Sequence, residues 1–144
     1  MFKMDQQLLK DTIEIGDFTL CRVLLMNDSR YPWLILVPRC EDVSEMFELT
    51  PAQQQQLWQE TSHAGRVLKN IFQADKINIA TLGNVVKQLH MHVVVRMQGD
   101  DAWPAPVWGK GSALAYTEEA IKDIRQRLEV GLTGFWLANS EVGA

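Results

Sequence analysis

The sequence has few of the residues from which metal centres and disulfide frameworks are built. It contains only two cysteines, Cys21 and Cys40, and they form no Cys-x-x-Cys pair. A zinc site based on cysteine therefore has no support. We expect both cysteines to be small, buried, reduced residues.

An excess of positive charge and long apolar runs are also missing. The chain has 14 basic and 18 acidic residues, a net charge of −4, and no dense Lys/Arg block. It thus lacks the electrostatic footprint of a nucleic-acid binder, and we expect no nucleic-acid partner. No apolar run approaches the ~20 residues that cross a bilayer, and residues 1–11 lack the apolar segment of a signal peptide. We therefore expect a soluble cytoplasmic protein with no membrane partner.

What the chain does have is an ordinary globular composition, with 47% apolar and 22% charged residues. Its 144 residues are enough to bury one substantial core, and no internal repeat or linker divides them. We therefore predict a single domain over residues 1–144.

Two apolar runs in the first third of the chain predict a β-hairpin. Residues 17–28 are rich in Leu and Val and end in a polar turn. Residues 31–39 form a second run, bracketed by Pro32 and Pro38. Proline is tolerated at the ends of a strand but not within its ladder, so the second strand should lie between the two prolines.

Helical periodicity begins after this hairpin. Thr50 and Gln53 match a capping box, with a proline at the first helical position between them. Apolar residues then recur at helical spacing, which predicts a helix over residues 51–72. Much later in the chain, Thr117 is expected to cap a last helix, because two glutamates follow it in the first turn.

Residues 76–84 and 88–96 are two further apolar runs that predict a second pair of strands, followed by a loop rich in Trp, Pro and Gly. The short connection within each strand pair favours antiparallel pairing. The expected fold is therefore α+β: an antiparallel sheet of about five strands, with a long helix and a C-terminal helix on one side.

The stretch QLHMHVVVR, residues 88–96, holds two of the three histidines in the chain. In a strand, side chains alternate between the two faces. The side chains of Gln88, His90 and His92 should therefore share one face, with aliphatic residues on the other. Three interpretations of the two imidazoles compete.

In the first interpretation, the histidines are incidental polar residues on a solvated face of the sheet. In the second, they bind a transition metal, which requires a third ligand. His63, Asp100 or Asp101 would have to fold back to supply it, and nothing in the sequence points to that. We therefore expect no metal and no other cofactor.

The third interpretation is phosphate chemistry. A neutral histidine presents a nucleophilic nitrogen near neutral pH and can take up a phosphoryl or nucleotidyl group. The second imidazole can donate a proton or a hydrogen bond to a phosphate oxygen or to the leaving group. Amides such as Asn84 and Gln88 can hold the remaining oxygens, which suits an acidic chain without a basic patch.

The segment GNVVKQLHMHVVVR resembles the active-site signature of the histidine triad (HIT) family, in which three histidines alternate with apolar residues. The similarity extends to LLMNDSRYPWLILVPR, which is similar to the first hairpin of the family, and to the order of the following elements. It covers roughly residues 15–110.

The resemblance implies specific roles. His90 matches the histidine that attacks the α-phosphate of a nucleotide and becomes transiently nucleotidylated, and His92 matches the residue that contacts the phosphate or the leaving group. Asn84 matches a phosphate-binding position and Asn27 the ribose-binding position. The implied substrate is a purine nucleotide conjugate, either a phosphoramidate or a dinucleoside polyphosphate. The implied fold is HIT-like, paired into a homodimer, and the covalent step needs no metal.

Two residues depart from the family pattern. Gln88 replaces the first histidine of the signature, and its amide cannot relay protons near neutral pH. Trp33 stands where many hydrolases of the family carry a further histidine, and its indole can only stack or donate one hydrogen bond. The sequence therefore predicts a hydrolase or nucleotidyl transferase with Gln88, His90 and His92 in the catalytic set. A nucleotide-binding or sensing module without turnover is the alternative.

The remaining candidate residues are expected to be structural. We expect packing for Trp103 and Trp108, and a solvated strand-end position for both Arg96 and Arg39. His63 lies beside the apolar stripe of the long helix and is expected to be a surface or structural residue.

Overall fold

The backbone of the computed structural model, which describes residues 1–138, forms one five-stranded sheet with neighbours in the order β1-β2-β3-β5-β4, all antiparallel. The elements in chain order are α1 (Gln6–Asp11), β1 (Thr12–Asp17), β2 (Cys21–Met26), β3 (Trp33–Pro38), a 3₁₀ turn η1 (Met46–Glu48), α2 (Pro51–Phe72), β4 (Lys76–Ala80), β5 (Met91–Arg96) and α3 (Glu118–Gly131). The predicted α+β antiparallel fold is confirmed.

The predicted hairpin is the pair β2–β3, in which Leu24 lies opposite Ile35. The ladder of β3 starts after Pro32 and ends at Pro38, as expected for residues that restrict the ends of a strand. Cys21 starts β2 and is buried, as expected, whereas Cys40 lies beyond β3 and is only half-buried.

The helix predicted over residues 51–72 is confirmed at both ends. The Thr50 side chain accepts a hydrogen bond from the backbone N–H of Gln53, and the Gln53 side chain accepts one from that of Thr50. This reciprocal box starts α2. The helix ends at Gln73, which adopts the left-handed conformation. Thr117 caps α3 in the predicted way, through the backbone N–H of Ala120.

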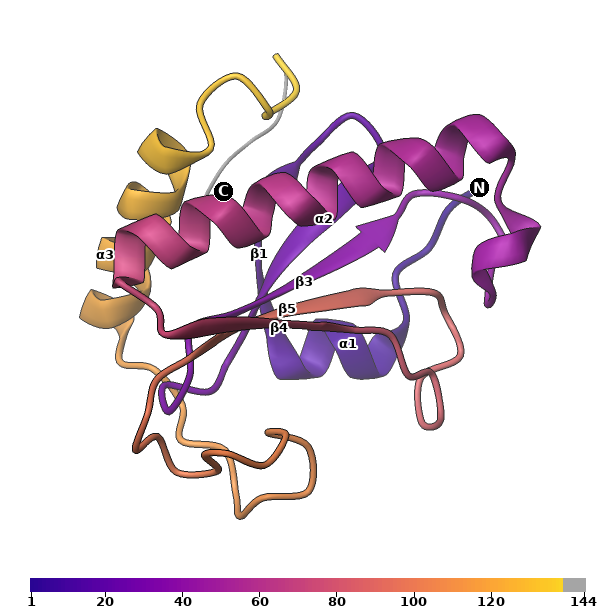
Figure 1. Ribbon diagram of the computed structural model, residues 1–144. Helices are drawn as coiled ribbons and strands as arrows, with labels where there is room; N and C mark the ends of the chain where they lie inside the picture. Colours follow the sequence, from indigo (N-terminus) through magenta and orange to yellow (C-terminus); the bar gives the residue numbers. More distant parts are fainter. Residues whose placement is uncertain (139–144) are drawn as a thin grey trace.

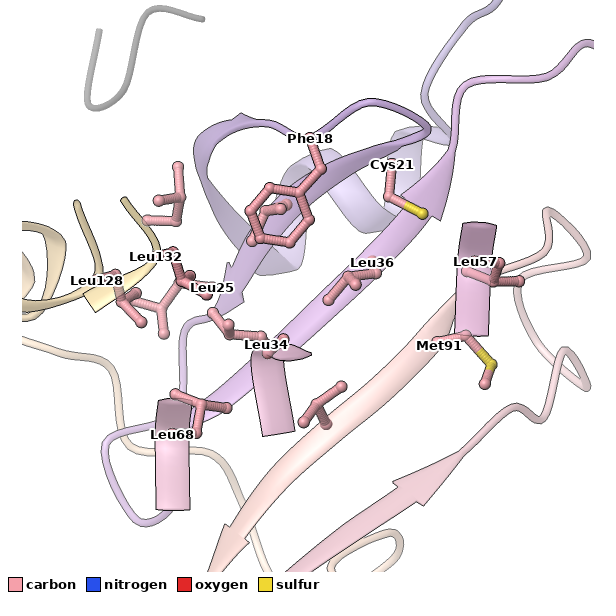
Figure 2. Packing of buried hydrophobic residues seen from close by; sticks show 14 of the residues in the cluster. Phe18, Cys21, Leu25, Leu34, Leu36, Leu57, Leu68, Met91, Leu128 and Leu132 are labelled. Carbon is pink, nitrogen blue, oxygen red and sulfur yellow. The ribbon is translucent and has the colours of Figure 1, made fainter. Parts of the chain in front are cut away.

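The main core lies between the sheet and the helices α2 and α3 (Figure 1). Strand residues such as Leu25, Leu34 and Met91 pack there against Leu57 and Leu68 of α2 (Figure 2). Because Met91 and Val93 point into this core, the residue between them must face the other side of the sheet.

The opposite face of the sheet is also covered, which corrects the expectation that the helices lie on one side only. The short helix α1 packs there, on the far side of the sheet from α2 (Figure 1). Leu8 of α1 joins a second buried cluster that includes Trp33, Ile35 and Val94. The site is therefore built on a face that is closed by α1 and by the loop after β5.

The strand predicted from residue 88 begins later, because the ladder of β5 starts at Met91. Gln88 and Leu89 approach the sheet outside the ladder, and the Leu89 N–H donates to the carbonyl of Val43 instead. Within residues 1–138, no helix is both long and apolar enough to cross a bilayer.

Candidate active site

His90 lies immediately before β5, and His92 is the second residue of this strand. His92 is opposite Ile35 of β3 and Ala80 of β4, so it stands in the middle of the paired strands. The ring centroids of the two histidines are 4.8 Å apart, with an interplanar angle of 74°. Each residue is only 5% exposed. The predicted pairing of the two imidazoles on one face is thus observed, and both rings are largely buried.

The imidazole of His90 is oriented by the backbone of Gln88. Its Nδ1 lies 2.7 Å from the Gln88 carbonyl oxygen. A carbonyl oxygen can only accept a hydrogen bond, so Nδ1 carries the proton in the neutral ring. The lone pair therefore lies on Nε2, which is the nitrogen that can attack an electrophile.

The imidazole of His92 has the opposite tautomer. The indole N–H of Trp33 donates to its Nδ1 over 3.0 Å, and an indole nitrogen can only donate. In the neutral ring the proton must therefore lie on Nε2. Burial, together with the neighbouring His90, lowers the pKa of His92 to about 3. Near neutral pH, His92 is thus an uncharged hydrogen-bond donor through Nε2.

Aromatic rings support this arrangement. The ring of Trp108 packs edge to face against two other rings. Its centroid lies 5.1 Å from that of His92 and 5.8 Å from that of Trp33. Tyr31 contacts Trp33 from the other side at 6.5 Å. Such edge-on contacts stabilise a fixed geometry of the rings. The packing expected for Trp108 is observed, and this packing forms part of the site.

The two histidines line a cavity of about 310 Å³. Its wall comes from α1, from the strands, from the loop that precedes the histidines and from the loop after β5. The lining residues are Gln7, Leu8, Asp11, Thr12, Met26, Ile35, Leu82, Gly83, Asn84, Val85, Val86, His90, His92 and Trp108. Most of this wall is apolar. Among the described residues, none that lines the cavity is Lys or Arg, and Asp11 is the one acidic side chain. A ligand would therefore be held by apolar contact and by neutral hydrogen-bond donors.

Gln88 does not line this cavity. Its side-chain Oε1 accepts from the backbone N–H of Asp5 and its Nε2 donates to the carbonyl of Lys3, both over 2.8 Å. The side chain therefore ties the N-terminal segment to the entrance of β5, beside a separate open hollow of about 620 Å³. Gln88 contributes to the site through its carbonyl, which holds His90.

The two asparagines are placed differently. Asn84 lines the cavity, on the exposed loop between β4 and β5. Gly83, just before it, has φ +84°, a conformation in which glycine is at no disadvantage. Asn27 lies outside the cavity wall, and its Oδ1 accepts from the backbone N–H of Tyr116. Asn27 therefore anchors the segment that leads into α3.

The residues that α1 gives to the cavity, Leu8 and Asp11 among them, were not found from the sequence. A helix of six residues is too short to show a clear apolar period. Trp33 was noted only as a departure from the family pattern. The signal that would have identified its role is its register on β3, two residues before Ile35, which is the residue opposite His92.

Two of the side chains considered as third metal ligands, Asp100 and His63, have other partners. Asp100 receives two hydrogen bonds from Arg96, at 2.8 and 3.0 Å. His63 stacks on Phe135, with ring centroids 3.6 Å apart. Within residues 1–138, no three His, Cys, Asp or Glu side chains converge as a metal site would need.

The expectation of a solvated Arg96 is wrong. The residue is 1% exposed, and its guanidinium bonds to Asn78 as well as Asp100 and lies against the rings of Tyr31 and Trp103. The physical reason is the tight turn after β5, which returns Asp100 to the guanidinium. A buried charge is costly unless it is paired and hydrogen-bonded, and Asp100 and Asn78 meet both needs of the guanidinium.

Comparison with known proteins gives a consistent result. The model of the HIT domain matches residues 8–99. A histidine triad protein from Sinorhizobium meliloti 1021 has 48% sequence identity and a TM-score of 0.90, and the match covers 92% of this chain and 98% of that one. A histidine triad protein from Marinobacter aquaeolei VT8 has 46% identity and a TM-score of 0.92, with 94% and 98% covered. None of the curated proteins matches the chain.

Proposed function

The chain belongs to the HIT domain family, and we propose that it is a nucleotide hydrolase or nucleotidyl transferase that acts at the α-phosphate of a nucleotide conjugate. Membership of the family supports a nucleotide-binding or hydrolase-type function in general. The observation that carries the finer proposal is the fixed lone pair on Nε2 of His90, at the wall of a cavity beside the N–H donor of His92.

The chemistry follows from these two tautomers. Nε2 of His90 forms a bond to the α-phosphorus while the bond to the leaving group breaks, which leaves a nucleotidyl-histidine. The positive charge that develops on the ring is stabilised at Nδ1–H by the carbonyl of Gln88. A water molecule then attacks the phosphorus, the electron pair of the P–N bond returns to Nε2, and one water proton passes to solvent. In a transferase, another acceptor replaces the water.

The cavity suits a purine nucleotide conjugate, either a phosphoramidate or a dinucleoside polyphosphate. Its apolar wall, which includes Leu8, Ile35 and Trp108, offers surface to a base and a sugar. Asn84 and the backbone around Gly83 lie on the same wall as the histidines and are proposed to hold phosphate oxygens. We also propose that Asn27 acts on the ribose side indirectly, by fixing the segment at Tyr116.

The test uses adenosine phosphoramidate and diadenosine polyphosphate that carry a label on the α-phosphate. We expect acid-labile label on the wild-type protein and none on His90→Asn. His63→Asn is the matched control, because His63 stacks on Phe135 outside the cavity, and it should be labelled like the wild type. Absence of label and of turnover with every nucleotide conjugate would refute the catalytic proposal.

A binding or sensing module is the second candidate, and the positions of Gln88 and Trp33 favour it. Both residues occupy positions of family histidines, and both are engaged in fixed hydrogen bonds. Calorimetry separates the two functions. Nucleotide binding that is unchanged by His90→Asn, without any hydrolysis, would identify a sensor.

We further propose that the chain is a single domain over residues 1–144 and pairs into a homodimer along β4. This strand ends the sheet, and Ile79 on it is 38% exposed. Gly65 of α2 faces Ile77 and Ile79, so this helix packs against β4. Trp58 precedes Gly65 on α2 by about two helical turns and is 56% exposed, so it adds apolar surface on the same helix. An open edge with apolar side chains is a ready pairing surface.

Analytical ultracentrifugation tests the dimer with the variant Ile79→Lys. We expect Ile79→Lys to be a monomer. Val130→Lys is the matched control, because Val130 is an exposed apolar residue on α3, away from β4, and the variant should stay dimeric. A wild-type monomer would refute the proposal.

We also propose a cytoplasmic location. The free thiols of Cys21 and Cys40 suit it, and cell fractionation tests it.

A further inference from the structure

Among the described residues that line the cavity, the side chain that can donate to a departing group is His92. The Nε2 of His90 is the nucleophile, and its Nδ1–H is bound to the carbonyl of Gln88. The hydroxyl of Thr12 donates to the carbonyl of Leu8. Asp11 is an exposed carboxylate that accepts a hydrogen bond from Gln7. The proton on Nε2 of His92 is what remains.

His92 can share this proton but cannot give it up. Loss of the Nε2 proton would leave an anionic ring, because Nδ1 holds no proton and Trp33 cannot supply one. Transfer would need the imidazolium form, and a pKa of about 3 leaves roughly one ring in ten thousand protonated at pH 7. An anionic substrate would favour that form, but the second proton would have to sit on Nδ1, directly against the N–H of Trp33.

The consequence depends on the bond that is broken. When a P–O bond of a phosphoanhydride breaks, the electron pair leaves on a phosphate oxygen, which is stable as an anion. A hydrogen bond from Nε2–H of His92 is then sufficient. When a P–N bond of a phosphoramidate breaks, the electron pair leaves on nitrogen, which must receive a proton as it departs.

We propose that this site cleaves nucleotide conjugates whose leaving group departs as a stable oxyanion, as in dinucleoside polyphosphates, and discriminates against phosphoramidates, because Trp33 holds His92 as a donor that cannot transfer its proton. The inference rests on the proposed function. Within it, Trp33 is a positioning residue: it acts on the substrate through His92, and it sets which of two substrate classes the site can use.

The experiment measures kcat/KM for diadenosine polyphosphate, adenosine phosphoramidate and a series of aryl esters of adenosine monophosphate with leaving groups of different pKa. We expect at least about a hundredfold preference for the anhydride over the phosphoramidate, the size of one general-acid contribution. In the aryl series, kcat/KM should fall by nearly tenfold for each unit by which the pKa of the leaving group rises.

Variants at position 33 separate this role from mere packing. Trp33→His places a second imidazole against Nδ1 of His92 and should flatten the dependence on the leaving group while it raises phosphoramidate turnover. Trp33→Phe keeps an aromatic ring but removes the N–H that donates to Nδ1 of His92. Nδ1 can then take up a proton, so kcat/KM should change with pH on the acid side, where the wild type shows no such change. Trp136→Phe is the matched control, because the Trp136 indole donates to the carbonyl of Glu129 outside the cavity, and its slope should equal that of the wild type.

The wild type alone keeps the inference falsifiable if a variant fails to fold. Label on His90 with similar rates for anhydride and phosphoramidate, and a flat aryl series, would overturn the inference but leave the proposed function intact. No label on His90 from any conjugate would instead overturn the proposed function. ¹⁵N NMR of the imidazoles gives an independent readout: a wild-type His92 that is protonated on Nδ1 would also overturn the inference.

Discussion

The side chain of Gln88 receives a hydrogen bond from the backbone N–H of Asp5, 83 positions earlier in the chain. A second bond, from Gln88 to the carbonyl of Lys3, completes the link. Because α1 starts immediately after Asp5 and supplies part of the cavity wall, this amide connects the N-terminus to the wall of the cavity beside the two histidines.

Gln88→Ala is therefore expected to loosen the N-terminal segment. Loss of two hydrogen bonds at a partly exposed site should cost about 1–2 kcal/mol of unfolding free energy. Amide exchange at Asp5 should become faster, and KM should rise more than kcat falls, because His90 keeps its bond to the carbonyl at position 88. Lys87→Ala, on the exposed neighbour, is the control. Unchanged exchange at Asp5 would contradict the role of the side chain.

The pH dependence of stability should report the buried His92. Its pKa is about 3 in the folded protein, through burial and the neighbouring His90, and near its ordinary value of ~6.5 in the unfolded chain. Below pH ~6.5 the unfolded state binds more protons than the folded state. The contribution of His92 to stability is therefore complete above that pH and is lost as the pH falls toward 3, by up to about 1.4 kcal/mol per pH unit.

Urea unfolding at several pH values from neutral to mildly acid checks this expectation. His92→Gln should show a shallower loss of stability than the wild type. His63→Gln is the necessary companion, since burial and the nearby Arg66 lower the pKa of His63 as well. If wild type and His92→Gln lose stability equally on acidification, His92 is not held neutral in the folded protein.

The buried ion pair between Arg96 and Asp100 should be essential for stability. Burial acts to raise the pKa of Asp100, but hydrogen bonds from Arg96 and from two backbone N–H groups keep it below its usual value. Asp100→Asn leaves a buried guanidinium without a counter-charge and should cost about 3–5 kcal/mol. Asp101→Asn, at the exposed next residue, should change stability by less than about 0.5 kcal/mol. Equal midpoints for the two variants in urea would contradict the assignment.

The two thiols should differ in reactivity. Burial and the adjacent Glu60 carboxylate raise the pKa of the Cys21 thiol well above its ordinary value. Cys40 is half-buried, and burial raises its pKa too, while Arg39 acts in the opposite direction. Iodoacetamide should therefore modify Cys40 first in the folded protein, and both residues at similar rates in urea. Mass spectrometry of the modified peptides measures both rates, and faster modification of Cys21 would contradict the expectation.

The elements that were predictable from sequence carry their signals locally. The capping box of Thr50, the cap at Thr117 and the prolines around β3 each act within a few residues of themselves. By contrast, α1 and β1 have six residues each, and each has a single buried residue, so neither shows a readable period. The strand order and the burial of both faces of the sheet depend on contacts between distant segments, so no local sequence pattern predicted them.

The site was predictable in its location but not in its connections. The spacing of His90 and His92 placed both imidazoles together because alternation along a strand is a local property. The partners of Gln88 and Asn27 lie 83 to 89 positions away in the chain, and no short pattern encodes them. Arg96 was misjudged for a different reason: its main partner Asp100 is only four residues away, but the turn that brings the two together has no clear sequence signal, and Asn78 on β4 adds a second bond.

The acceptor that holds His90 is a main-chain carbonyl, which every amino acid carries. Exchange of the side chain at position 88 is therefore expected to leave the bond to His90, and the tautomer that it fixes, in place. The glutamine at this position adds the link to the N-terminus, while the lone pair of His90 stays on Nε2. At position 88, the side chain and the backbone therefore have independent roles: the side chain holds the N-terminal segment, and the carbonyl holds His90.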